Sequence, residues 1–164
     1  MSWLNIIVAD PFNDNHVKMF NDFEELNNPN KPMTKYMESI RNTCDKEKYN
    51  KIVNNNNEFN TIIFTMDENN IRDYCLLKGE KDRKVCELFF ASLKDNKHRS
   101  IMDKASKYAL DVLGMEQLFV SITAKEGKLY NQLINNGYED IGEVNGKITL
   151  LKEKEDEIEI GKKI

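Results

Sequence analysis

Apolar and polar residues follow two different periods along this 164-residue chain, and each change of period marks a new element. The apolar run at 4–10 is ended by Pro11 and predicts a first strand. Apolar residues then recur at helical spacing in two segments, one starting near His16 and one starting near Thr34. A polar stretch at 54–60 separates these two expected helices from the part of the chain that follows.

The middle of the chain consists of strand-like runs separated by short polar turns. These runs lie at 61–66, 71–79 and 84–93, and together they predict an antiparallel meander. A helix is expected from Ser100 onward, because apolar residues recur there every three or four positions until Gly114.

The last third of the chain alternates between the same two periods. A strand at 117–123 precedes a helix that ends at Gly137, and two strand-like runs then flank the Asn-Gly pair at 145–146, a strong hairpin signal. The expected order is β-α-α-β-β-β-α-β-α-β-β, an α/β (α+β) chain with a mixed, mostly antiparallel central sheet flanked by helices. We expect one domain over 1–152, followed by a charged tail at 153–164.

Composition limits the function without assigning one. Hydrophobic residues make up 40% and charged residues 32% of the chain, as in ordinary globular domains. The net charge of −4 does not favour nucleic acid or a membrane as a partner, and no apolar run reaches the length of a membrane span. The scattered Cys44, Cys75 and Cys86 fit a reducing compartment, so we expect a cytoplasmic protein. No metal motif is seen, and His16 is expected at the exposed start of a helix.

The order of elements resembles the GNAT superfamily of N-acetyltransferases, and the second half of the chain also resembles it in local sequence. The run from 84–93 through the helix to GMEQLFVSI is similar to the cofactor-binding core of that superfamily, and KLYNQLINNGYEDIGEV is similar to its usual ending. The pair Gly137-Tyr138 stands where Gly-Phe is common. The resemblance implies a sheet that splays open beside the helix, with acetyl-CoA in the opening and its pyrophosphate against the helix N-terminus.

The loop before that helix departs from the family pattern. The resemblance places cofactor-binding residues at Leu93, Asn96, Lys97, His98, Arg99 and Ser100. The family's loop carries glycines, which let the backbone approach a phosphate, whereas SLKDNKHRS contains none. Its basic side chains could hold a pyrophosphate in place of the backbone, or the segment could be an ordinary solvated loop. The sequence leaves both interpretations open.

Acetyl transfer needs a base for the amine proton and an acid for the departing thiolate. Glu87 is the best candidate base, because it shares an otherwise apolar strand face with Val85 and Phe89, where burial would raise the pKa of a carboxylate. The family's acid is often a helix tyrosine, at a place that Leu133 takes here, while Tyr130 lies one turn earlier on nearly the same face. Alternatively, Glu87 could be an exposed glutamate near a strand end with no role in catalysis, and Tyr130 could be a half-buried aromatic residue of the helix.

Two functions fit these residues. The first is an acyl-CoA-dependent N-acetyltransferase that moves an acetyl group from acetyl-CoA to an amine of unknown identity. The alternative is a catalytically inactive protein of the GNAT fold, a pseudoenzyme that acts as a binding or structural module, for example in phage or viral assembly. A homodimer or a subunit of a larger assembly fits either function. A pocket for a cationic amine should be acidic, and the candidates for it are Asp10, Asp14, Glu24 and Glu25.

Overall fold

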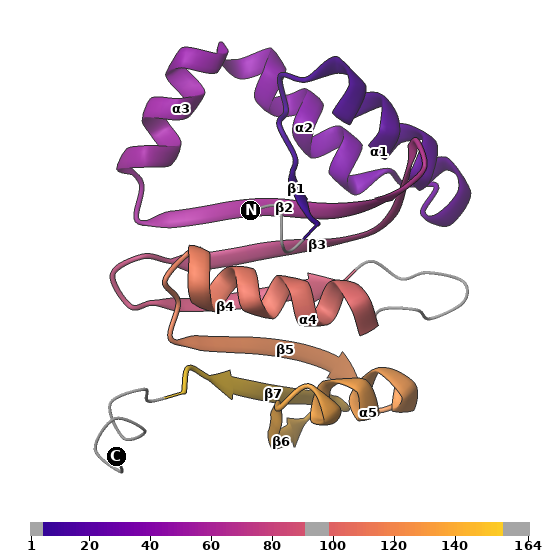
Figure 1. Cartoon of the computed structure of the whole chain (residues 1–164), viewed down its shortest axis with the longest axis vertical. Coiled ribbons are helices and arrows are strands. Elements are labelled where there is room, and N and C mark those ends of the chain that lie inside the picture. The colour runs from indigo at the N-terminus through magenta and orange to yellow at the C-terminus, as the bar shows by residue number, and fades with distance from the viewer. Residues whose placement is uncertain (1–4, 91–98, 156–164) are drawn as a thin grey trace.

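The computed structural model describes residues 5–90 and 99–155, which form a seven-stranded sheet with helices on both faces (Figure 1). The elements in chain order are β1 (Ile7–Val8), α1 (Asp14–Asn27), α2 (Pro32–Thr43), α3 (Lys46–Asn55), β2 (Glu58–Asp67), β3 (Asn70–Glu80), β4 (Val85–Phe90), α4 (Arg99–Lys107) with a π-helical turn (Tyr108–Val112), β5 (Gln117–Thr123), α5 (Gly127–Asn135), β6 (Glu139–Val144) and β7 (Lys147–Glu153). This order confirms the expected fold class and adds one helix, α3.

The sheet has the strand order β1-β2-β3-β4-β5-β7-β6, and every neighbouring pair is antiparallel except β4 with β5. The parallel pair is short, running from Val85 opposite Gln117 to Glu87 opposite Phe119. Beyond that point the two strands part, although β4 continues to Phe90. A parallel pair needs a crossover connection, and α4 supplies it on one face of the sheet (Figure 1).

One hydrophobic core lies between the sheet and α4. Alternate strand residues such as Leu77, Leu88 and Leu118 point toward this face, as the two-residue period of a strand requires. Met102 of α4 and Leu133 of α5 pack on them, and all five side chains are at most 1% exposed. The periodicity after Ser100 was therefore interpreted correctly, although α4 begins one residue earlier than predicted, at Arg99.

The second core lies on the opposite face, where α1 and α2 cover β2 and β3. Phe20 of α1 is fully buried and meets the rings of Phe64 and Tyr74 edge-on, at centroid distances of 5.4 and 5.3 Å. Met37 of α2 completes this core. Among the described residues, none from β4 to β7 belongs to it, so the helices on this face cover only part of the sheet.

The buried carboxylate of Glu24 fixes α2 against α1. It accepts hydrogen bonds from the N–H groups of Met33 (3.1 Å) and Thr34 (2.7 Å) and from the Thr34 hydroxyl (2.7 Å). The residue that precedes α2, Lys31, makes no capping hydrogen bond with its own side chain. Glu24 therefore satisfies N–H groups that the first turn of a helix leaves unpaired, and its negative charge suits the positive end of the helix dipole.

Two further expectations need correction. The chain before the polar stretch at 54–60 forms α3, a helix capped by Asp45, which accepts from Lys48 N–H at 2.8 Å. His16 is half-buried instead of exposed, because its ring packs edge-on against Phe64 at a centroid distance of 5.3 Å. Glu153, the first residue of the expected tail at 153–164, is the last residue of β7. Residues 156–164 lie outside the described part of the chain, so most of the tail stays a prediction.

Replacement of Glu24 by alanine should lower the free energy of unfolding by about 2–4 kcal/mol, because it leaves buried N–H and hydroxyl donors without an acceptor. Urea denaturation followed by circular dichroism measures this change. The control is Glu25→Ala, which removes an exposed ion pair with Lys31 and should cost less than about 1 kcal/mol. Equal effects of the two substitutions would contradict the capping role of Glu24.

Candidate functional site

The point at which β4 and β5 part is the centre of the candidate site. Glu87 and Phe119 form the last residue pair of the parallel ladder. The N–H of Glu116 donates to the carbonyl oxygen of Lys84 at 2.8 Å, so the chain leaving the crossover returns to the start of β4. The first residue of α4, Arg99, therefore lies toward the other end of β4, where the strands are apart.

Two of the six cofactor residues expected from the sequence are described by the structure, and both fall at this end of the sheet. Leu93, Asn96, Lys97 and His98 lie outside the described residues. Arg99 and Ser100 are the first two residues of α4, so their backbone N–H groups belong to its first turn. The N–H groups of a first helical turn have no partner within the helix and carry a partial positive charge, which attracts an anion such as a phosphate.

Glu87 lies on the face of the sheet opposite α4 and lines an open pocket of about 620 Å³. Its neighbours Cys86 and Leu88 point to the other face and are buried in the first core, as the expected alternation along β4 requires. Five strands contribute to the pocket, whose lining is Glu58, Phe59, Asn60, Lys78, Gly79, Glu80, Val85, Cys86, Glu87, Phe119, Ser121 and Thr149.

Carboxylates dominate the charge of this pocket. Glu58 and Glu80 lie opposite one another in the β2–β3 register and join Glu87 in the lining, where Lys78 is the only lysine or arginine among the described residues. The ammonium of Lys78 lies over the ring of Phe89, 6.0 Å from its centroid. A ligand with a positive charge therefore suits the pocket better than an anion does. Sequence reasoning missed Glu58 and Glu80, because only the strand register brings them to the face of Glu87.

Tyr130, the candidate acid, lies on α5 and is hydrogen bonded to the edge strand of the sheet. Its hydroxyl donates a hydrogen bond of 3.0 Å to Asp140 of β6, a strand that β7 separates from β5. This hydrogen bond raises the pKa of Tyr130, because it holds the proton and places a negative charge beside the oxygen. Leu133, at the family's usual place for the acid, is fully buried in the first core.

The four acidic residues suggested for an acceptor pocket do not form one. None of them lines the pocket at Glu87, and Glu24 is fully buried beneath α2. Asp14 pairs with Arg41 at 2.6 Å, and Glu25 and Asp10 pair with lysines on neighbouring segments. The acidic lining beside Glu87 thus comes from the strands and not from the first two helices.

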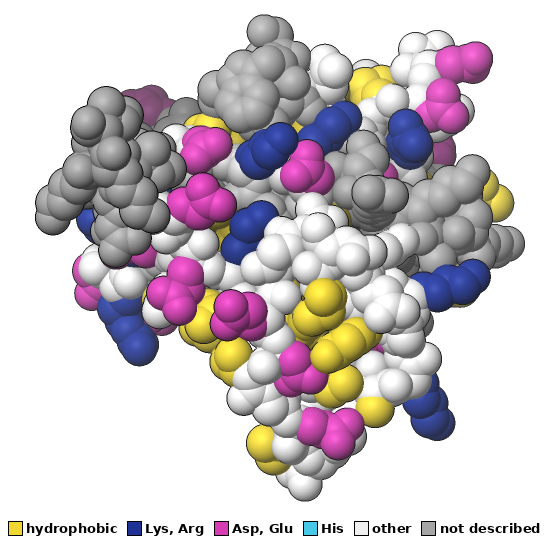
Figure 2. Space-filling view, turned by 60° about the horizontal axis from the view of Figure 1, so that its bottom comes forward, with side chains coloured by type: hydrophobic (Ala, Val, Ile, Leu, Met, Phe, Trp, Pro, Cys, Tyr) yellow, Lys and Arg dark blue, Asp and Glu magenta, His cyan; other side chains and the backbone are white. Residues whose placement is uncertain are grey.

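The β6–β7 end of the sheet exposes hydrophobic side chains. Figure 2 brings this end forward and shows hydrophobic side chains gathered at the surface among Asp and Glu side chains. On β6, which is an edge strand, Ile141 is 52% exposed and Val144 is 72% exposed. These two residues leave an apolar edge open to contact with another chain.

Comparisons with known proteins identify the fold. No protein-family model matches the sequence, and no curated protein sequence matches it. A variant of the spermidine N-acetyltransferase SpeG from Vibrio cholerae matches with a TM-score of 0.63 at 12% identity, over 90% of this chain and 94% of the other. The Campylobacter jejuni N-acetyltransferase PseH in complex with acetyl coenzyme A matches with a TM-score of 0.62 at 12% identity, over 92% and 99%. The chain has the GNAT fold.

Within this GNAT fold, the described residues contain no group of three or more His, Cys, Asp and Glu side chains placed to hold a metal ion. None of the helices in the described part of the chain has the length and apolar character needed to cross a membrane.

Substitution of Asp140 by asparagine should lower the pKa of Tyr130 toward the usual value near 10, because an amide oxygen carries no full charge to hold the phenol proton. The carbon-13 shift of the Tyr130 ring, followed by NMR from pH 8 to pH 12, measures this change. Glu139→Gln removes a neighbouring charge that makes no hydrogen bond to Tyr130 and is the matched control. A pKa that stays raised in Asp140→Asn would show that Asp140 is not the cause.

Proposed function

We propose that this protein transfers an acetyl group from acetyl-CoA to an amine. The observation that carries the proposal is the parting of β4 and β5 directly after Glu87 and Phe119, with the start of α4 at the open end. This arrangement supports the proposal because β4 and β5 are unpaired beyond Glu87, which leaves room for a ligand between them, and because the first turn of α4 can attract an anion. PseH, which shares the fold, was solved in complex with acetyl coenzyme A.

The start of α4 is the proposed site for the pyrophosphate. The amides of Arg99 and Ser100 supply partial positive charge there, and an arginine carries a full positive charge that can pair with a phosphate. Leu93, Asn96, Lys97 and His98 belong to the same proposed site through the family resemblance. Side chains that donate hydrogen bonds would then replace the close backbone approach that the family's glycines allow.

The proposed chemistry places the amine in the pocket beside Glu87. The carboxylate removes a proton from the ammonium form, and the freed nitrogen attacks the carbonyl carbon of the thioester. The C–N bond forms and the C–S bond breaks, and Tyr130 is the proposed donor of a proton to the departing thiolate. The second proton of the attacking nitrogen then passes to the Tyr130 phenolate, and Glu87 releases its proton to solvent, so the products are the amide, the CoA thiol and one proton. The hydroxyl of Tyr130 must leave Asp140 to donate its proton.

The acceptor is proposed to be a cationic amine, because Glu58, Glu80 and Glu87 line the pocket together with one lysine, Lys78. Glu80 is paired with Arg83 at 3.2 Å, so Glu58 and Glu87 are the main candidates to attract the amine. SpeG, which shares the fold, is a spermidine N-acetyltransferase, so an amine with more than one positive charge is a suitable first acceptor to test.

Isothermal titration with acetyl-CoA tests the first half of the proposal, and micromolar binding is expected. Arg99→Glu should weaken this binding by at least about a hundredfold, because it places a negative charge beside the pyrophosphate. Lys107→Glu, at the other end of α4, is the matched control and should bind as the wild type does. Unchanged affinity in Arg99→Glu would remove the pyrophosphate from this helix.

Replacement of Glu87 by glutamine should lower kcat by about 10²- to 10⁴-fold at neutral pH, because the amide cannot accept the amine proton. Acetyl-CoA affinity should not change, since Glu87 lies on the face opposite α4. Release of free CoA thiol in the presence of spermidine measures the rate. Glu143→Gln on β6 controls for loss of charge, and a Glu87→Gln rate equal to the wild type would exclude Glu87 as the base.

Tyr130→Phe, measured in the same assay, should lower kcat and leave acetyl-CoA affinity intact. A normal rate would leave Tyr130 with its structural contact to Asp140 alone.

A binding or structural module is the second candidate function, and the exposed apolar residues Ile141 and Val144 on the edge strand β6 favour it. Absence of acetyl-CoA binding at millimolar ligand would support this candidate. A dodecameric structure of SpeG shows that the fold can assemble into large oligomers. Light scattering after size-exclusion chromatography, with Val144→Lys as the variant, would then measure whether β6 mediates assembly.

A further inference from the structure

A second cavity, of about 250 Å³, lies beneath α3 and is bounded by α2, α3, β1 and β2. Four residues of α3 line it: Lys46, Tyr49, Asn50 and Val53. Their spacing of three, four and seven positions places them on one face of the helix. No residue of α3 is buried, so the inward face of this helix closes a cavity instead of packing on the sheet.

Polar contacts hold α3 at both of its ends. At the start of the helix the ammonium of Lys46 pairs with the carboxylate of Asp10 at 3.2 Å. At the end of the helix the ammonium of Lys81 donates to the carbonyl oxygens of Val53 (2.9 Å) and Asn54 (3.5 Å). These ties fix the position of α3 over the cavity without filling the space beneath it.

The floor of the cavity is apolar, and its walls combine aromatic and aliphatic side chains with the polar Asn50, Asn60 and Thr61. Met37 and Ile62, which are 0% and 5% exposed, belong to the second core and also line the cavity. Tyr36 and Tyr49 are half-buried, and burial raises the pKa of both hydroxyls, so both side chains are neutral at physiological pH. Such a lining suits an uncharged, apolar group of modest size.

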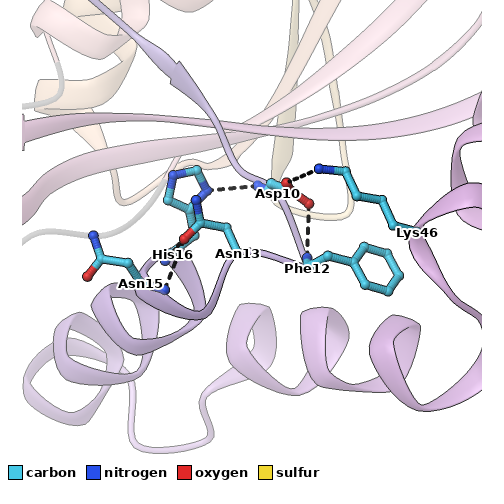
Figure 3. A network of polar contacts seen from close by, with 6 residues as sticks. All are labelled: Asp10, Phe12, Asn13, Asn15, His16 and Lys46. Carbon is cyan, nitrogen blue, oxygen red and sulfur yellow. Dashed lines mark hydrogen bonds and ion pairs between the residues drawn. The ribbon is translucent and has the colours of Figure 1, made fainter.

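Two opposite charges lie together where the cavity meets solvent. Asp10 and Lys46 both line it, and their side chains are 31% and 61% exposed (Figure 3). One carboxylate oxygen of Asp10 accepts from Phe12 N–H at 2.9 Å, and the Asp10 N–H donates to Nδ1 of His16 at 3.0 Å. The position of the carboxylate is therefore set by the protein before any ligand arrives.

Asp10 is ionised at neutral pH. Partial burial works to raise its pKa, but the hydrogen bond from Phe12 N–H and the positive charge of Lys46 outweigh that effect, so the pKa lies below its usual value. The half-buried ring of His16 has a lowered pKa, chiefly because of burial, and accepts the Asp10 N–H in its neutral form. The carboxylate and the ammonium at the mouth thus both carry full charge.

We propose that this cavity binds a free α-amino acid with an apolar side chain. The ligand ammonium pairs with Asp10, the ligand carboxylate pairs with Lys46, and the side chain lies on Met37 and Ile62. An amine without a carboxylate would meet the repulsion of Lys46, and an acid without an ammonium would meet that of Asp10. The cavity volume of about 250 Å³ equals the volume of roughly eight water molecules in the liquid. A space of this size admits one amino acid and excludes a folded peptide.

This site is separate from the groups that react in the proposed acetyl transfer, although Asn60 lines both cavities. It lies under α3, and neither Glu87 nor any residue of α4 lines it. Its occupation can therefore be measured without acetyl-CoA and without any turnover.

Titration calorimetry with L-leucine tests the proposal on the full-length protein. Three matched compounds each lack one feature: 3-methylbutylamine lacks the carboxylate, 4-methylpentanoate lacks the ammonium, and glycine lacks the side chain. Leucine should bind at least about tenfold more tightly than any of them, as expected for the loss of one charged contact or of the apolar contact. L-Phenylalanine in the same titration tests whether the cavity prefers a larger side chain.

Asp10→Asn and Lys46→Gln should each weaken leucine binding by about tenfold, whereas Lys48→Gln, an exposed lysine of α3 that does not line the cavity, should leave it unchanged. Lys46 is exposed, so Lys46→Gln keeps the test valid if Asp10→Asn fails to fold. The proposal is overturned by absence of heat from leucine and phenylalanine at millimolar concentration. Equal binding of leucine and 3-methylbutylamine, or unchanged affinity in Lys46→Gln, would overturn it too.

Discussion

The short parallel ladder between β4 and β5 is the constraint on which the candidate site depends. All of β5 from Gln117 to Thr123 pairs with β7, but only its first part pairs with β4. β5 pairs with β7 along its whole length, and among the described residues the part of β4 after Glu87 pairs with no strand on that side. The crossover helix α4 must start at that open end and return along one face. Glu87 is therefore the last residue of β4 that pairs with β5, and α4 follows β4 in the chain.

A second constraint decides which face of the sheet can take a ligand. Glu24 ties α2 to α1, and the pair covers β2 and β3 through Phe20 and Met37. The rest of that face, over β4 to β7, receives no helix from the described chain. Glu87 lies on this uncovered part, so the same packing that buries the second core leaves the pocket open. A helical layer of greater width would have filled that pocket.

The sequence predicted the elements that carry a strong period or a specific turn. The alternation along β4 placed Glu87 on the correct side, and the Asn-Gly pair at 145–146 forms the hairpin turn with positive φ at both residues. The helix α3 was missed because none of its residues is buried and its apolar residues are few. Glu24 could not be identified as a buried cap, because its partners, such as Thr34, come together only after α1 and α2 pack.

The same limit applies to both ligand sites. Glu58 and Glu80 are polar residues at strand ends in the sequence, and only the register shows that they share a pocket with Glu87. Asp10 and Lys46 are far apart in the chain and meet because β1 and α3 lie on either side of one cavity. A local pattern specifies which residues share one face of a helix or strand. A site also depends on contacts between segments that are distant in the chain, and a local pattern does not specify these contacts.

The two cavities share a wall. Asn60 of β2 lines the pocket of Glu87 and also the cavity under α3, and its side chain is hydrogen bonded to Tyr36 of α2. A ligand that displaces the Tyr36 hydroxyl must therefore change the position or the hydrogen bonding of a residue in the other pocket. Coupling between two binding sites is reciprocal. If a ligand under α3 changed the affinity for an amine beside Glu87, the amine would change the affinity for the ligand under α3 by the same factor. Because Asn60 is exposed and makes one such bond, any coupling through it is small, and the two sites act largely as separate binding events.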